Sequence, residues 1–144
     1  MPYAGWHLIS NHCRPTNDSL EVIFAPIVND IVQVKDLLGN LYVLAFALNN
    51  GLNNWDMAKG YLVKANAPTT LIINGAPEID LNFESIPLYT GWNLIAYWLQ
   101  GSADPVQVFN AISSDVIQIK NLQGSYTPSF GFNNMGNMEK MLDT

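Results

Sequence analysis

The residues of this chain with the most obvious chemistry are its two histidines and its single cysteine. His7, His12 and Cys13 lie close together in the sequence, and imidazole and thiolate groups are preferred ligands of zinc. On a continuous strand, His7 and Cys13 would share one face and His12 would point to the other, because side chains alternate along a strand. We therefore predict no metal site and no cofactor.

Residues for acid–base or nucleophilic catalysis form no recognisable constellation. No serine lies in a Gly-x-Ser-x-Gly elbow, and only two histidines are present to act as a base. Asp80 and Glu84 could serve a glycosidase only if they faced a cleft, and solvated acids are the ordinary finding in such a connecting segment. No glycine-rich phosphate loop is present. We predict that the protein is not an enzyme.

Aromatic and amide side chains are the best candidates for a ligand site. Rings stack on the flat apolar faces of sugars, and amides hydrogen-bond to sugar hydroxyls. The candidate residues, which we expect to be exposed, are Trp55, Trp98, Tyr97, Asn53 and Asn54. For the asparagines the favoured interpretation is a structural loop, in which their side chains bond to nearby backbone groups, and a site for a glycan or for calcium is the alternative.

Composition narrows the classes of partner. The chain has a net charge of -6, a pI near 4.5 and 12% charged residues, which disfavours binding to a phosphate backbone. No apolar run approaches the length of about 20 residues that spans a bilayer, so we expect neither nucleic-acid binding nor membrane insertion. The opening sequence MPYAGWHLIS shows no signal peptide, and a single cysteine permits no internal disulfide.

An internal repeat is the strongest pattern in the sequence. Gly5–Ile9 (GWHLI) matches Gly91–Ile95 (GWNLI), and Val22–Leu44 aligns with Gln107–Ser129, in which the hairpin is one residue shorter. The aligned pairs include Phe24 with Phe109, Ile27 with Ile112, Lys35 with Lys120, and Tyr42 with Tyr126. Apolar positions, turn residues and a lysine recur together, which indicates a duplicated structural unit. A tryptophan that opens each unit, Trp6 or Trp92, is predicted to be buried.

Each repeat is predicted to contain a strand, a short helix and a hairpin. The opening strands are Gly5–Ser10 and Gly91–Trp98, which alternate in polarity. The helices are expected to begin after Asp18 or Ser19 and after Asp104, which are favoured N-cap residues. Pro26 is expected to shorten the first helix. The hairpin turns are Asp36–Gly39 and Asn121–Gly124, in which the glycine suits a left-handed position.

Two further strands, Gly60–Ala65 and Thr69–Gly75, are predicted in the first repeat and have no counterpart in the second. The predicted boundaries are repeat 1 at 1–76, a connector at 77–90, and an incomplete repeat 2 at 91–144. The predicted fold class is β-rich α+β, with two pseudo-symmetric repeats of short antiparallel strands and one short helix each. Unpaired strand edges would then be exposed.

The motif blocks resemble the GWNLIS-type repeats of large secreted and cell-surface proteins of Bacteroidota and similar bacteria. The matching blocks are Gly91–Ile95, Phe24–Ile27, Val34–Tyr42, Asn49–Trp55 and Lys59–Lys64. The resemblance implies an extracellular or surface-attached β-rich module within a longer exported chain. It implies no catalytic residues. The second copy departs from the pattern because it lacks the Lys-Gly-Tyr block.

The sequence favours a non-catalytic structural or adhesive repeat module of a secreted or cell-surface assembly. Its expected partners are other protein chains or further repeats, joined through strand donation, as a homo-oligomer or as a filament. The alternative is a carbohydrate-binding module that binds a glycan through exposed tryptophan or tyrosine. An enzyme of unknown class ranks third.

Overall fold

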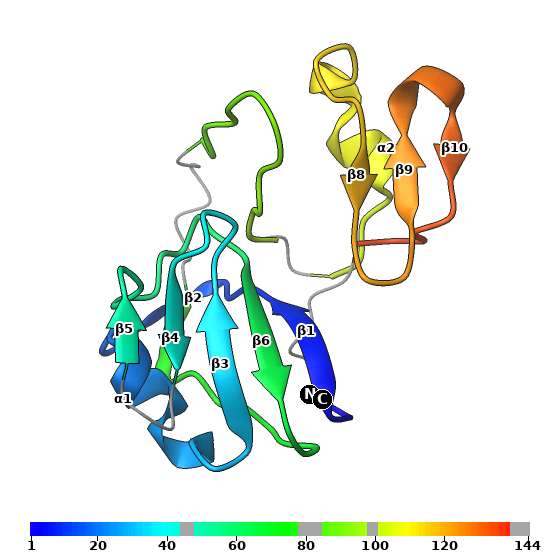
Figure 1. Cartoon of the computed structure of the whole chain (residues 1–144). Helices are drawn as coiled ribbons and strands as arrows, with labels where there is room; N and C mark the ends of the chain where they lie inside the picture. Colours follow the sequence, from blue (N-terminus) through cyan, green and yellow to red (C-terminus); the bar gives the residue numbers. More distant parts are fainter. Residues whose placement is uncertain (44–47, 78–84, 98–100, 139–144) are drawn as a thin grey trace. The chain divides into compact units, whose positions relative to one another are not determined.

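The computed structural model describes residues 1–43, 48–77, 85–97 and 101–138, and these form two compact units (Figure 1). The first unit is Met1–Ala96 and the second is Tyr97–Thr144. The strands of the first unit are β1 (Gly5–Ile9), β2 (Cys13–Pro15), β3 (Ile31–Lys35), β4 (Leu41–Val43), β5 (Leu48–Asn50), β6 (Tyr61–Ala65) and β7 (Gly75–Pro77). The described chain as a whole is rich in antiparallel strands, as predicted.

The main sheet of the first unit has the strand order β1-β6-β3-β4-β5, and every neighbouring pair is antiparallel (Figure 1). Strand β6 lies between β1 and β3 and shows the expected alternation. Tyr61, Val63 and Ala65 are buried, whereas Leu62 is half-buried and Lys64 is exposed. A separate two-stranded sheet joins β2 to β7. The predicted strand at Gly60–Ala65 is therefore confirmed.

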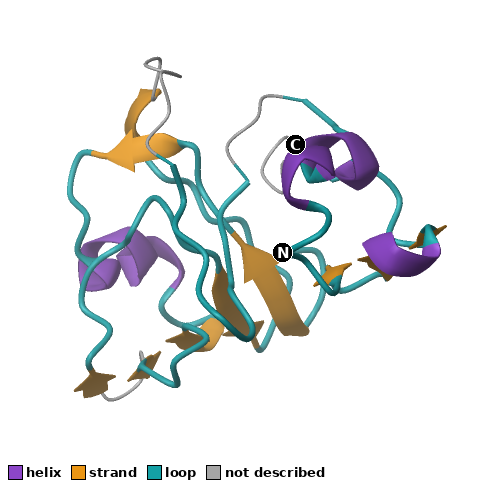
Figure 2. Ribbon diagram, turned by 90° about the horizontal axis from the view of Figure 1, so that it is seen from above, coloured by secondary structure: helices purple, strands orange, loops and turns teal. Residues whose placement is uncertain are grey.

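The core of the first unit lies between the inner face of this sheet and one short helix, α1 (Leu20–Phe24). Leu20 and Phe24 of α1 are fully buried with Val34 of β3 and Val63 of β6. The helix ends at Phe24 and continues as the 3₁₀ turn Ala25–Ile27, because the ring of Pro26 cannot continue an α-helix. Figure 2 shows these helical segments in purple beside the orange strands.

The second unit has fewer strands in its described part. Its elements are α2 (Pro105–Val108), the 3₁₀ turn Asn110–Ile112, β8 (Ile119–Lys120), β9 (Ser125–Thr127), the 3₁₀ turn Pro128–Phe130 and β10 (Phe132–Asn133). The strand order is β10-β9-β8. Helix α2 begins as predicted, because the carboxylate of Asp104 accepts a hydrogen bond from the backbone N–H of Val106 at 2.9 Å.

The two hairpin turns are closed by the same kind of hydrogen bond, from backbone N–H groups to the side chain of the first turn residue. Asp36 Oδ1 accepts hydrogen bonds from the backbone N–H groups two and four residues later, at 2.9 and 3.0 Å. Asn121 Oδ1 accepts them from the N–H groups two and three residues later, at 2.9 and 2.8 Å. Lys35 pairs with Leu41 in the first hairpin, and β8 pairs with β9 through a turn one residue shorter. Both predicted hairpins are confirmed, including their difference in length, and Gly39 takes the predicted left-handed conformation with φ 86°. The same prediction for Gly124 is wrong, because its backbone does not have a positive φ.

The predicted strand Gly91–Trp98 is wrong in its described part. Ile95 makes an isolated bridge to Lys59, and the backbone N–H of Gly60 donates to the carbonyl of Leu94 at 3.1 Å. The matching strand β1 is held by a five-residue register with β6, and no such partner lies beside Gly91–Ala96 in the described part of the chain. The prediction that Trp92 is buried is also wrong, because its side chain is 57% exposed.

The predicted strand Thr69–Gly75 is wrong as well. Residues 69–74 form no strand, and β7 begins only at Gly75. The apolar alternation buries Leu71 and packs Ile73 against the core. However, the backbone bonds go to two separate segments: Thr69 N–H donates to the carbonyl of Met1 at 2.9 Å, and the carbonyl of Asn74 accepts from Thr16 N–H at 3.0 Å. Alternation in the sequence therefore reports burial here and not strand pairing.

Candidate functional site

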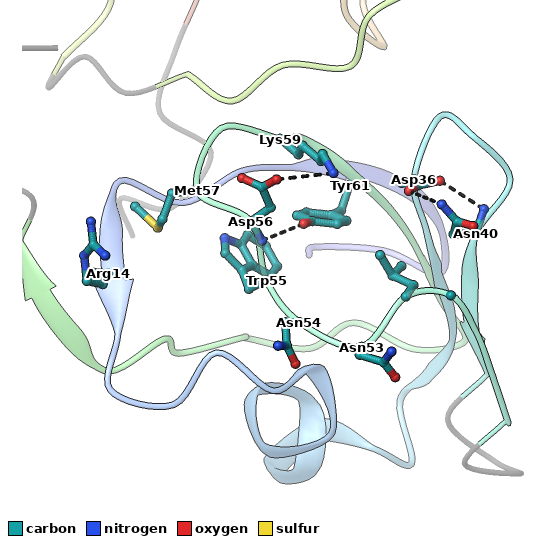
Figure 3. Close-up of a pocket in the computed structure, with 12 residues that line it drawn as sticks. Arg14, Asp36, Asn40, Asn53, Asn54, Trp55, Asp56, Met57, Lys59 and Tyr61 are labelled. Atoms are coloured by element: carbon teal, nitrogen blue, oxygen red, sulfur yellow. Dashed lines mark hydrogen bonds and ion pairs between the residues drawn. The ribbon is translucent and has the colours of Figure 1, made fainter. Parts of the chain in front are cut away.

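The Asn-rich loop and Trp55 line a pocket of about 570 Å³ in the first unit (Figure 3). Its walls come from β2, the β3–β4 turn, the loop after β5 and the start of β6. The lining residues are Arg14, Asp36, Asn40, Gly51, Leu52, Asn53, Asn54, Trp55, Asp56, Met57, Lys59 and Tyr61. This pocket brings three of the sequence-predicted site residues together: Asn53, Asn54 and Trp55.

The loop is fixed by backbone bonds to the start of α1. The carbonyl of Asn53 accepts a hydrogen bond from Leu20 N–H at 2.9 Å, and Trp55 N–H donates to the carbonyl of Asp18 at 2.7 Å. Ser19, the N-cap residue, makes no side-chain cap, so the carbonyl of Asn53 satisfies one of the free N–H groups at the helix start. The side chains of Asn53 and Asn54 are left exposed at the pocket.

Trp55 and Tyr61 form the buried floor of the pocket. Their ring centroids are 4.6 Å apart with the planes tilted by 42°, and Trp55 is only 4% exposed. The prediction that Trp55 offers an exposed face for sugar stacking is therefore wrong. The ring follows Leu52 into the core and leaves the two asparagines outside, because its apolar area gains more from burial than from contact with water.

The hydroxyl of Tyr61 accepts a hydrogen bond from the backbone N–H of Asp56 at 2.7 Å (Figure 3). Burial raises the pKa of Tyr61 to about 12, and the negative charges of Asp56 and Asp36 add to this rise, while the N–H bond acts against it. Tyr61 is thus neutral at physiological pH.

The indole N–H of Trp55 has no acceptor among the described residues and is sealed from solvent. In Figure 3 the indole nitrogen lies on the side of the ring that faces Met57. A buried donor without a partner costs about 1–3 kcal/mol. Because the nitrogen is sealed, a ligand in the pocket cannot reach it without a movement of the surrounding side chains.

The acidic groups of the pocket are bonded within the protein. Asp56 lies 3.2 Å from Lys59 and accepts a hydrogen bond from Ala58 N–H at 2.9 Å. Asp36, which is buried, accepts from the side-chain amide of Asn40 at 2.8 Å in addition to its turn bonds. The exposed amides of Asn53 and Asn54 remain, and these suit a neutral, polar ligand.

The other two predicted ligand residues are Tyr97 and Trp98. Tyr97 belongs to the second unit, and its hydroxyl donates to the carbonyl of Gly101 at 2.8 Å. Burial raises the pKa of Tyr97. Trp98 lies outside the described residues, and so do Asp80 and Glu84. The predicted aromatic platform of Trp98 and Tyr97 therefore stays a prediction.

The histidines and the cysteine are placed differently from the strand-based prediction. His7 is buried, and its Nε2 lies 2.9 Å from the carbonyl oxygen of Tyr3. Cys13 Sγ lies 3.3 Å from His12 Nε2, although alternation placed them on opposite faces, because β1 ends at Ile9. Within the described ranges, no group of three or more His, Cys, Asp or Glu residues could hold a metal ion.

Sequence reasoning missed a contact on the outer face of the main sheet. The Nζ atoms of Lys35 and Lys64 lie 4.5 and 5.9 Å from the centroid of the Trp6 ring. Trp6 is half-buried, so the prediction that it is a core residue is wrong. The sequence held one signal for this contact. The Gly-Trp pair that includes Trp6 and the lysine at the end of the hairpin strand, Lys35, both recur in the second segment.

None of the described helices has the length and apolar character that crossing a bilayer requires. Functional interpretation rests on geometry, since comparisons with protein-family models, with curated proteins and with solved structures find no match.

Proposed function

We propose that this chain is a non-catalytic structural repeat module that assembles with other polypeptide chains, in the secreted or cell-surface setting that the GWNLIS-type resemblance implies. The observation that carries the proposal is a difference in burial between aligned positions of the two units. Ile23 on α1 is 7% exposed, whereas the aligned Val108 on α2 is 38% exposed. An apolar surface that one unit buries is accessible in the described part of the other.

The difference in burial between aligned residues of the two units extends beyond the helices. Residues that are buried in the first unit align with half-buried residues in the second: Ile27 with Ile112, Ile31 with Val116, and Val34 with Ile119. In the first unit, these residues pack with the inward side chains of β6 and with Leu52 and Trp55. Burial of apolar area contributes about 25 cal/mol per Å², so covering the matched surface of the second unit is favourable.

Large apolar side chains also stand exposed on the second unit. Ile117 is 86% exposed, Phe130 is 85% exposed and Phe132 is 53% exposed. Exposed apolar side chains that gather on one surface commonly mark interaction sites. This exposure supports association with another polypeptide.

The test is the mass of the full chain in solution, measured by sedimentation velocity and light scattering over a wide range of concentration. We expect species larger than 16.0 kDa, which Ile117→Asn or Phe130→Ser shifts toward the monomer while circular dichroism stays unchanged. Val22→Asn is the matched control, because Val22 is an exposed apolar residue of the first unit. A monomer at every concentration, with parent and variants alike, would contradict the proposal.

The pocket at Trp55 supports a second candidate, the binding of a sugar or similar neutral polar ligand. The supporting observation is the pair of exposed amides of Asn53 and Asn54 at the rim of the pocket. Affinity electrophoresis in gels that contain polysaccharides tests this function. Retardation should be lost in the double variant Asn53→Ala and Asn54→Ala and kept in Asn29→Ala, a control at an exposed asparagine outside the pocket.

A further inference from the structure

We propose that the second unit binds an extended peptide strand beside β8, in the position that β6 occupies beside β3 in the first unit. This inference rests on the proposed function, because it names the kind of partner that the assembling surface takes. The recruited segment is a strand of another polypeptide with the chemistry of β6. Binding would occur by β-strand addition, in which backbone bonds supply affinity and alternate side chains supply specificity.

The first unit shows what such a strand contributes. Strand β6 runs antiparallel to β3, with Val63 opposite Val34 and Ala65 opposite Ile31. The inward side chains of β6 are fully or almost fully buried, as is Val34. The core of this unit therefore depends on β6, which closes the apolar surface that β3 and α1 leave open.

The second unit presents the matching surface. Strand β8 is the terminal strand of the described sheet, whose order is β10-β9-β8. Val116 and Ile119 align with Ile31 and Val34, and both are half-buried where their counterparts are buried. Ile117, one of the two residues between them, is 86% exposed. A strand laid beside residues 116–119 would cover Val116 and Ile119 as Ala65 and Val63 of β6 cover Ile31 and Val34 of β3.

The chemistry of the recruited strand follows from this template. Its inward positions, at every second residue, need an aromatic, a β-branched and a small apolar side chain, as Tyr61, Val63 and Ala65 provide. Its outward positions tolerate polar or charged groups, as Lys64 shows. The strand should run antiparallel to β8, since β6 is antiparallel to β3.

A second copy of this chain is a poor donor of that strand. In the main sheet, β6 lies between β1 and β3, so both of its edges are already hydrogen-bonded. A copy could donate β6 only by dismantling its own first unit. The donor of this strand is therefore a separate segment with β6-like alternation that is not already paired on both sides. Association between copies, which the proposed function predicts, would instead use the exposed side chains of the second unit without strand exchange.

The experiment uses the full chain and a synthetic peptide with the sequence of residues 58–67, AKGYLVKANA. Hydrogen exchange followed by mass spectrometry is recorded with and without saturating peptide. We expect exchange at residues 116–119 to slow by about tenfold or more, with β1 and β3 unchanged. A shuffled peptide of the same composition, and a peptide with Val63→Asp, should give no protection. In the chain, Ile119→Asp should abolish the protection of residues 116–119 by the peptide. The milder Ile119→Ala should weaken this protection while the hairpin remains folded.

Three outcomes would overturn this inference. The first is equal protection by the shuffled peptide. The second is slow exchange at residues 116–119 before any peptide is added, which would mean that this edge is already covered. The third is that the peptide protects no residue although sedimentation shows that the chain associates. This result would support the proposed function and contradict strand addition. Protection by the peptide in a chain that never associates would support strand addition and contradict assembly between copies.

Discussion

The ammonium group of Lys35 lies over the ring of Trp6, with Nζ 4.5 Å from the ring centroid. Trp6 is on β1 and Lys35 is on β3, and β6 runs between these strands. The contact therefore spans three strands on the outer face of the sheet. It gives Trp6 a role on the outer face of the sheet, whereas the sequence predicted this residue in the core.

Removal of this contact should destabilise the first unit modestly. A double-mutant cycle with Lys35→Met and Trp6→Leu should give a coupling energy of about 0.5–1 kcal/mol, the range of exposed cation–π pairs. Urea unfolding followed by circular dichroism measures it. Lys64→Met is the matched control, because its Nζ lies farther from the ring, at 5.9 Å. A coupling for Lys64 equal to that for Lys35 would refute the assignment.

The side chain of Asp36 should contribute more to the free energy of unfolding than its place in a turn suggests. Asp36→Ala leaves two backbone N–H groups without their acceptor, and we expect a loss of about 1–3 kcal/mol in the free energy of unfolding. Asp36→Asn installs the residue that the second hairpin uses at Asn121, which keeps the Oδ1 acceptor. The asparagine variant should lose less than half as much in the same urea titration, and equal losses would show that the charge and not the turn bonds matters.

Equivalent truncations should have unequal effects in the two units. Ile23→Ala removes a buried side chain and should cost about 2–5 kcal/mol. Val108→Ala removes a side chain that is 38% exposed and should cost less than about 1 kcal/mol. Hydrogen exchange resolved by peptide reports each unit separately. Similar costs at both positions would mean that the surface around Val108 is covered in solution.

The stability of the first unit should fall at high pH. The pKa of Tyr61 is raised to about 12 from 10.0, so the native state keeps this proton after the unfolded state has lost it. Its contribution is fully present below pH 10 and is lost as pH rises through about 12. The pKa of Tyr42 is raised in the same direction, by burial and by the charge of Glu21.

Thermal unfolding between pH 9 and pH 12 measures this effect. Two pKa units correspond to about 2.7 kcal/mol, which sets the scale of the loss attributable to Tyr61. Tyr61→Phe has a lower starting stability, because Asp56 N–H loses its acceptor, but its dependence on pH should be shallower. Tyr42→Phe is the control for the smaller contribution. An unchanged pH slope in Tyr61→Phe would contradict the assignment.

Local chemistry made much of the fold predictable. The carboxylate of Asp104, the ring of Pro26 and the turn side chains Asp36 and Asn121 act on residues within four positions of themselves, so their effects can be derived from the sequence. The alternation of Tyr61–Ala65 identified a strand because both of its neighbours in the sheet lie within the same unit.

The predictions that were wrong share one cause: the structure of each segment depends on residues distant in the sequence. Residues 69–74 alternate in polarity as a strand does. They form no strand, because their backbone hydrogen bonds go to separate segments near the N-terminus. Gly91–Ile95 repeats the sequence of β1 without a neighbouring β6. Trp55 sits in a polar loop, and only the tertiary arrangement places its ring under Asn53 and Asn54 and against Tyr61. The exposure of the two asparagines follows from their polarity, whereas the burial of the tryptophan was not predictable from the sequence.

The arrangement of β1, β6 and the segment around Ile95 also determines how the first unit bears mechanical load. Gly5 lies opposite Ala65 at one end of β6, while Ile95 bridges to Lys59 just beyond the other end. A pull applied through Gly5 and Ala96 therefore acts along the strands, and all five residue pairs between β1 and β6 resist it together. Such shear loading makes the unit hard to extend by force, whereas loading from one end would break the same bonds one after another.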